Sequence, residues 1–256
     1  MKLAITFLVL ATVMAVTGCA RKESNQPEQP PATAIVDLST AGSISGTVKL
    51  EGAPPVPKKI IVTAGPECAK LNPDLTYPEV VLGDDGALAN VVVYVKSGLG
   101  RYRFETPSTL AKLDQKGCMY EPHVMAVMTH QSLEVTNTDP IVHNVHPASH
   151  INHPWNKSQP VGGAPIEASF DHPELAVPVL CNVHPWMRAY LFVFADPYFY
   201  VTSRAGTFEL KNLPPGAYTV EAWQEKYGTL DQTVTIGPKE SRSILFTFKS
   251  TESHGD

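Results

Sequence analysis

The chain is poor in cysteine, in net charge and in segments free of helix-breaking residues. It has 4 cysteines in 256 residues, too few free thiols for an iron–sulfur cluster. Lys and Arg number 20 against 25 Asp and Glu, a net charge of −5, which gives no electrostatic attraction to nucleic acid or to an anionic membrane surface. The 23 prolines and 17 glycines place a breaker at about every sixth residue and predict an all-β fold. With 43% hydrophobic residues, a chain of this length can bury one or two cores.

The N-terminal sequence is typical of a secretion signal. Lys2 precedes an apolar run over residues 3–16, which is shorter than the roughly 20 residues that a transmembrane helix needs. The run ends in Val16-Thr17-Gly18-Cys19, which resembles the bacterial lipobox, whose cysteine receives diacylglycerol and becomes the new N-terminus. The resemblance implies a signal peptide over residues 1–18 and a lipid on Cys19; an ordinary signal peptide with a chance cysteine is the alternative.

Residues 19–42 are polar and proline-rich, so we expect a flexible tether. The lipid then holds the folded part to a membrane on the periplasmic side of a bacterial cell envelope. Ala20 stands where an aspartate often retains such proteins at the inner membrane, which favours the outer membrane.

Strand patterns occupy both ends of the remaining chain. Gly206-Thr207-Phe208, Leu213-Pro214-Pro215-Gly216-Ala217-Tyr218 and Thr233-Val234-Thr235 resemble the carboxypeptidase regulatory-like family, whose members are small transthyretin-like sandwiches. Such a sandwich opens with a Gly-Thr-Val strand and an apolar second strand, which match residues 46–48 and 90–95 here. About fifty residues from position 200 onward would bury only a marginal core alone, which favours borrowed strands.

We therefore expect two β-sandwiches, with one interrupting the other. The regulatory-like sandwich would comprise residues 43–114 and 196–250, a second module residues 115–195, and a short tail residues 251–256. Two independent sequential domains are the alternative. The strand at residues 90–95 could also belong to the inserted module.

The inserted module contains a compact group of metal-binding residue types. Eight of the nine histidines lie in residues 115–195, and Cys181-Asn182-Val183-His184-Pro185-Trp186-Met187 joins two apolar strands. A thiolate, an imidazole and a weak thioether on one loop are three of the four ligands that a copper ion cycling between two oxidation states needs. The second imidazole must come from elsewhere, and His143, which follows the turn Asp139-Pro140, offers it.

These motifs resemble the cupredoxins, and within them the amicyanin type. That family has a Cys-x-x-His-Pro-aromatic-Met loop and a distant His-Asn-Val-His segment, which match residues 181–187 and 143–146. The resemblance implies a Greek-key sandwich that holds one type 1 (blue) copper ion. The residues matched to roles are the ligands His143, Cys181, His184 and Met187, the bracing residue Asn144, and the docking collar Pro185 and Trp186.

The resemblance also implies a function. The edge of His184 would reach the surface, and the collar would dock redox partner proteins transiently. Such a protein passes single electrons and is not an enzyme. Two alternatives remain: a periplasmic protein that handles copper without redox turnover, and an envelope-binding or carbohydrate-binding module in which copper is structural.

Two further sites have competing interpretations. With Cys19 and Cys181 assigned, Cys68 and Cys118 remain as a pair, and in an oxidising compartment they form either a disulfide or two free buried thiols. Three more histidines, His146, His150 and His153, form either a second metal site or part of a solvated loop.

Other chemistry for the same loop is disfavoured. Zinc is the rival metal, but a structural zinc site prefers cysteine or histidine over methionine as its fourth ligand. For nucleophilic catalysis, Cys181 lacks a third group that would orient a neighbouring histidine.

Overall fold

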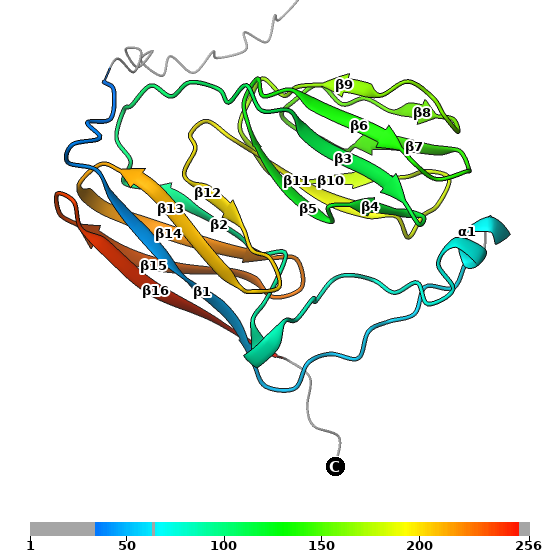
Figure 1. The fold of residues 1–256 in the computed structure, drawn as a ribbon, viewed down its shortest axis with the longest axis horizontal. Helices are drawn as coiled ribbons and strands as arrows, with labels where there is room; N and C mark the ends of the chain where they lie inside the picture. Colours follow the sequence, from blue (N-terminus) through cyan, green and yellow to red (C-terminus); the bar gives the residue numbers. More distant parts are fainter. Residues whose placement is uncertain (1–33, 63–64, 251–256) are drawn as a thin grey trace, which may run out of the picture. The chain divides into compact units, whose positions relative to one another are not determined.

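The computed structural model describes residues 34–62 and 65–250. Nearly every regular element in these ranges is a β-strand, and the strands form four sheets (Figure 1). The predicted all-β class with β-sandwich architecture is therefore confirmed. No helix in the described residues is both long and apolar enough to span a bilayer. The predicted signal peptide, the lipid on Cys19, most of the tether and the tail at 251–256 fall outside these ranges.

One sandwich is built from strands at both ends of the described chain. Its sheets have the strand orders β13-β1-β16 and β12-β2-β14-β15, and they enclose one apolar core. The strands are β1 (Gly42–Glu51), β2 (Val92–Ser97), β12 (Phe199–Val201), β13 (Thr207–Leu213), β14 (Gly216–Gln224), β15 (Gly228–Ile236) and β16 (Ser241–Lys249). β1 and β2 thus pair with strands that follow more than a hundred residues later in the sequence. The apolar strand expected at 90–95 lies in this outer sandwich, as part of β2.

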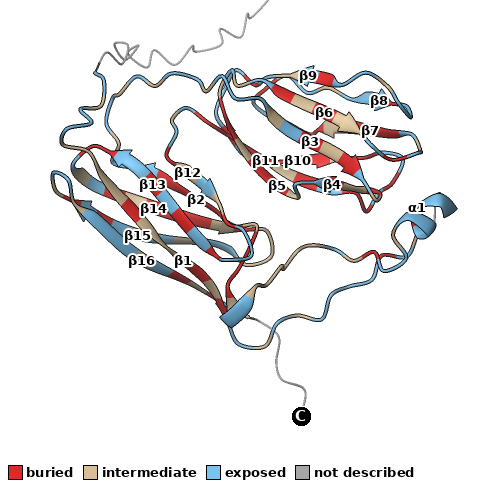
Figure 2. Cartoon of the chain, in the orientation of Figure 1, coloured by how far each residue is buried: buried red, intermediate tan, exposed pale blue. Residues whose placement is uncertain are grey.

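The intervening chain forms the second, inserted sandwich. Its sheets have the orders β5-β11-β10-β7-β8 and β4-β3-β6-β9, and both contribute to a second core (Figure 2). The strands are β3 (Ala111–Lys116), β4 (Met119–Glu121), β5 (Val124–Met128), β6 (Leu133–Asn137), β7 (His143–Pro147), β8 (Lys157–Gln159), β9 (Ile166–Ala168), β10 (Glu174–Leu180) and β11 (Arg188–Phe194). The expected boundary between residues 114 and 115 falls inside β3, because Leu113 and Gln115 are buried on one face of a strand that pairs with β6.

The segment between β1 and β2 departs furthest from the expected organisation. It carries a short helix, α1 (Pro66–Leu71), and a 3-10 turn, η1 (Asp84–Gly86). A disulfide joins Cys68 in α1 to Cys118 in the inserted sandwich, with a Cα–Cα distance of 5.6 Å. The predicted disulfide is thus confirmed. It attaches α1 to the inserted sandwich, although the sequence of α1 lies in the part assigned to the outer one.

Candidate metal centre

The loop of residues 181–187 is a tight connection between two paired strands. β10 ends at Leu180, which pairs with Arg188 at the start of β11. Inside the loop, the Cys181 amide donates to the Met187 carbonyl at 3.2 Å, and the Met187 amide donates to the His184 carbonyl at 2.9 Å. These backbone bonds fix the positions from which three of the predicted ligands project.

His143 reaches the same place from a neighbouring strand. It is the first residue of β7, which runs antiparallel to β10 through the pair Leu180 and His146. The end of β7 therefore lies beside the end of β10, and the start of β7, with His143, extends past Leu180 alongside the loop. In this way sheet pairing brings together histidines that are 41 residues apart in sequence.

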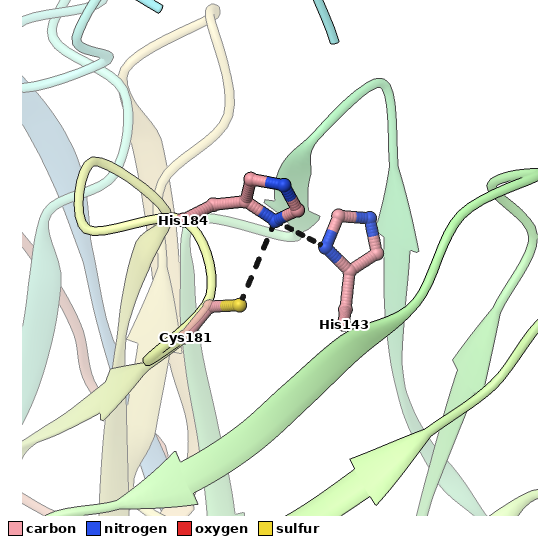
Figure 3. A group of neighbouring side chains, drawn as sticks. All are labelled: His143, Cys181 and His184. Carbon is pink, nitrogen blue, oxygen red and sulfur yellow. Dashed lines mark hydrogen bonds between the residues drawn. The ribbon is translucent and has the colours of Figure 1, made fainter. Parts of the chain in front are cut away.

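Three predicted ligands converge in the protein interior (Figure 3). The Nδ1 atoms of His143 and His184 lie 2.9 Å apart, and Cys181 Sγ lies 3.9 Å from His184 Nδ1. One ligand atom from each residue lies within 4.8 Å of the other two. The exposed fraction is 0% for His143 and 3% for each of Cys181 and His184.

These spacings fit one bound ion. Metal–nitrogen bonds of about 2.0 Å and metal–sulfur bonds of about 2.3 Å allow two nitrogens up to about 4 Å apart, and a sulfur and a nitrogen up to about 4.3 Å apart, on the same ion. The observed 2.9 Å and 3.9 Å fall within those limits.

A buried carboxylate orients His143, so the expectation that no third group orients a histidine beside Cys181 is wrong. Asp139 Oδ2 lies 2.8 Å from His143 Nε2, and the Asp139 side chain is 4% exposed. Because the carboxylate accepts from Nε2, the Nδ1 lone pair of a neutral His143 is directed at His184 and Cys181. The Asp-x-x-x-His spacing is visible in the sequence, but Asp139-Pro140 by itself indicates only a turn.

Asp139 also connects this histidine to the disulfide. Its carboxylate accepts hydrogen bonds from the amides of Gly117 at 2.6 Å and Cys118 at 2.8 Å. Gly117 and Cys118 form the two-residue turn between β3 and β4, and both have positive φ, 61° and 58°. This is the turn geometry that matches the twist of a hairpin.

Asn144, the predicted bracing residue, contacts the ligand loop. Its Oδ1 accepts from the amide of Asn182 at 2.6 Å and from that of Val183 at 3.3 Å, and it lies 3.5 Å from Cys181 Sγ. Its Nδ2 donates to Asn156 Oδ1 at 2.6 Å. One side chain thus ties β7 to the ligand loop.

The electrostatics favour a thiolate. Burial raises the pKa of the Cys181 thiol, but hydrogen bonds from His143 and from nearby backbone amides outweigh burial and hold that pKa below its ordinary value. Burial lowers the pKa of His143, but its hydrogen bonds with Cys181 and Asp139 outweigh this effect and raise it. The pKa of His184 is lowered by burial and then by the positive charge of His143.

Two expectations about the surface are wrong. His184 is 3% exposed and Trp186 is 5% exposed, whereas only Pro185 of the predicted collar is exposed. Trp186 is buried because its Nε1 donates to the Cys118 carbonyl at 3.2 Å and its ring packs 5.2 Å from that of His184. Gly65 covers the outer edge of His184, since a Cβ atom at Gly65 would lie 2.9 Å from His184 Nε2.

The remaining predicted groups are placed as follows. Met187 is completely buried at the end of the ligand loop. Histidines 146, 150 and 153 do not occur in either cluster of possible metal ligands in the described residues. The second of those clusters, Cys118 with Asp139 and His143, has its sulfur in the disulfide.

Comparisons with known proteins give only partial likenesses. No family model matches the sequence, and no curated protein matches it. Among solved structures, a copper-containing nitrite reductase from Thermus scotoductus is 18% identical with a TM-score of 0.31, covering 38% of this chain and 24% of its own. A purple cupredoxin from Nitrosopumilus maritimus is 18% identical over 32% of this chain and 98% of its own, with a TM-score of 0.28. A reduced Cu(I) amicyanin variant is 18% identical over 40% of this chain and 97% of its own, with a TM-score of 0.30. The chain therefore spans about a quarter of the length of the nitrite reductase.

Proposed function

We propose that the inserted sandwich binds one copper ion in a type 1 centre, and that the protein carries single electrons. His143, Cys181 and His184 would supply two imidazoles and a thiolate, and Met187 would supply a weak thioether. The observation that carries the proposal is the convergence of these three buried ligand atoms within 4.8 Å. A soft thiolate with two imidazoles is a donor set that suits copper, and the thioether adds a ligand that zinc disfavours.

The chain's own residues supply rigidity. Asp139 holds His143, Asn144 holds the ligand loop, and backbone bonds close the loop on itself. Bound copper supplies a one-electron couple between Cu(I) and Cu(II). Side chains held in one geometry reduce the rearrangement that accompanies a change of oxidation state, which favours transfer of single electrons over turnover of a substrate.

The setting of this activity follows from the N-terminal sequence. We propose that Cys19 carries a lipid that anchors the protein on the periplasmic side of a bacterial membrane. A shared membrane surface raises the effective concentration of redox partners that are also anchored there. The partners would dock transiently, and the net charge of −5 gives no reason to include nucleic acid among them.

One observation favours a second candidate function. The outer edge of His184 is covered by Gly65, so a partner cannot approach that nitrogen directly. A closed centre suits a protein that holds or delivers copper without exchanging electrons. The two functions differ in which oxidation states of bound copper are accessible.

Absorption of the copper-loaded full chain separates these possibilities. A thiolate bound to Cu(II) in a type 1 centre gives an intense visible band, which should appear after mild oxidation and disappear in Cys181→Ser. Met187→Leu should keep the band and shift the reduction potential, whereas Met128→Leu, which alters another buried methionine of the same sandwich, should change neither. A chain that binds Cu(I) but stays colourless on oxidation would support copper handling. Unchanged colour in Cys181→Ser would contradict both functions.

A further inference from the structure

We infer that Gly65 and the turn that it begins, residues 65–72, are a fixed cover that closes the outer side of His184 to solvent and small ligands. The inference extends the proposed function, since it says which side of the metal centre is shielded and by what. The cover consists of protein residues alone, so the inference can be tested on the metal-free chain.

The contact between Gly65 and His184 is close enough to require glycine. A Cβ atom at position 65 would lie 2.9 Å from His184 Nε2 and 3.5 Å from its Cδ2. Gly65 also has φ 73° and ψ 79°, a left-handed conformation that residues with a side chain rarely adopt. Absence of a side chain thus permits both the backbone turn and its position against the imidazole.

The cover is attached to the inserted sandwich by a covalent bond. Helix α1 begins directly after Gly65 and contains Cys68. The Cys68 amide donates to the Gly65 carbonyl at 2.9 Å. The disulfide partner Cys118 is fully buried, as is Cys68. The cover's far end is held as well, because the Asn72 amide donates to the Cys68 carbonyl at 2.9 Å and Asn72 Nδ2 donates to the Gly117 carbonyl at 3.4 Å.

The attachment point belongs to the structure that holds the ligands. The turn of Gly117 and Cys118 donates both of its amides to Asp139, which contacts His143. The Cys118 carbonyl accepts from Trp186, which packs on His184. The cover is therefore fixed relative to both imidazoles through short connections.

Flanking residues press the cover onto the same core. The Ile60 amide donates to the Leu75 carbonyl at 2.9 Å, and both side chains are buried in the core of the inserted sandwich. The cover is thus held by apolar contacts on both sides of the disulfide. We expect it to exclude small anions, free imidazole and chelators from the His184 side of the centre.

Chemical modification of the metal-free full chain tests the cover. Diethylpyrocarbonate acylates accessible imidazoles, and peptide mapping reports the rate at each histidine. His150 and His153 are exposed and serve as internal references. His184 should react at least about tenfold more slowly than these two, because it becomes accessible only when the cover opens locally.

Substitution of Gly65 tests whether the cover itself, and not only the general burial of His184, slows modification of this histidine. Gly65→Ala should displace the turn and raise the rate at His184 towards that of His150. The matched control is Gly228→Ala, because Gly228 has φ 77° with no atom within 4 Å of an added Cβ, so it shares the backbone strain without the collision. The control should leave the rate at His184 unchanged.

A second variant releases the cover by a different route. The double substitution Cys68→Ser with Cys118→Ser removes the attachment without a collision, and it too should raise the rate at His184. The inference is overturned if His184 in the unaltered chain reacts as fast as His150, or if both folded variants leave its rate unchanged. Failure of copper to bind would defeat the proposed function and leave these rates readable.

Discussion

The carboxylate of Asp139 and the ring of His143 form a buried pair, with 2.8 Å between Asp139 Oδ2 and His143 Nε2. The same carboxylate accepts two amide hydrogen bonds from the turn that carries Cys118. One acidic side chain therefore orients a candidate metal ligand and also connects it to the disulfide. A group that holds the outer nitrogen of a ligating histidine fixes its tautomer and increases its basicity.

Replacing Asp139 by asparagine should weaken metal binding. The amide keeps the shape of the side chain but removes the negative charge that faces His143, so affinity should fall by about 10- to 100-fold. Competition with a chelator of known affinity measures the change. Asp171→Asn is the control, because Asp171 pairs with His130 at 3.3 Å but is 72% exposed. Equal affinities for the two variants would contradict an orienting role.

Replacing Asn144 by alanine should loosen the ligand loop. The change removes the acceptor of two part-buried hydrogen bonds, those of the Asn182 and Val183 amides, which should reduce the free energy of unfolding by about 0.5–1.5 kcal/mol. Chemical denaturation of the metal-free chain measures this. Asn156→Ala removes only the partner of Asn144 Nδ2 and should cost less. A larger loss of unfolding free energy in Asn156→Ala than in Asn144→Ala would contradict a main role of Asn144 in holding the ligand loop.

The candidate ligand residues could be proposed from sequence because their signal is local. Cys181, His184 and Met187 lie in a run of seven residues, and their chemistry limits the ions that they suit. The partner His143 required knowledge of which strand pairs with β10, and a family resemblance supplied that information. Prolines and glycines excluded long helices, so the fold class followed from composition.

What the sequence did not reveal depends on contacts between distant segments. Gly65 is far from His184 in the chain, and its sequence neighbours indicate only a loop ahead of a cysteine. Trp186 was predicted to lie in an exposed docking collar because the family resemblance places the ligand loop at one end of the sandwich. Its burial results from the turn at Cys118, which no local pattern places there.

Removing the disulfide should destabilise the inserted sandwich. The bond closes a loop of 50 residues, which corresponds to about 4 kcal/mol of lost chain entropy in the unfolded state. The double substitution Cys68→Ser with Cys118→Ser should therefore lower the free energy of unfolding by an amount of that order. Denaturation followed at Trp186 would report on the sandwich concerned. A loss below about 1 kcal/mol would mean that the unfolded chain is already restricted there.

Acid stability should depend on Glu174. This buried carboxylate, at the start of β10, accepts hydrogen bonds from the loop of residues 149–152, including the His150 amide at 2.6 Å and Asn152 Nδ2 at 3.0 Å. Burial raises the pKa of Glu174, but the hydrogen bonds from Ser149, His150 and Asn152 outweigh burial and lower it from 4.5 to about 2. Because the folded-state pKa lies below the unfolded one, the carboxylate's contribution is complete above pH 4.5 and is lost as the pH falls towards 2.

Glu174→Gln tests this assignment. The variant should lose about 2 kcal/mol of unfolding free energy at pH 6, since an amide cannot accept all of these hydrogen bonds as a carboxylate does. It should also lose less stability than the unaltered chain between pH 5 and pH 3, because it has no proton to take up there. Glu167→Gln, which changes an exposed carboxylate of β9 in the same sandwich, should leave both quantities nearly unchanged. If Glu174→Gln retains the full acid-dependent loss, other carboxylates are responsible and the loop of residues 149–152 is held mainly by neutral contacts.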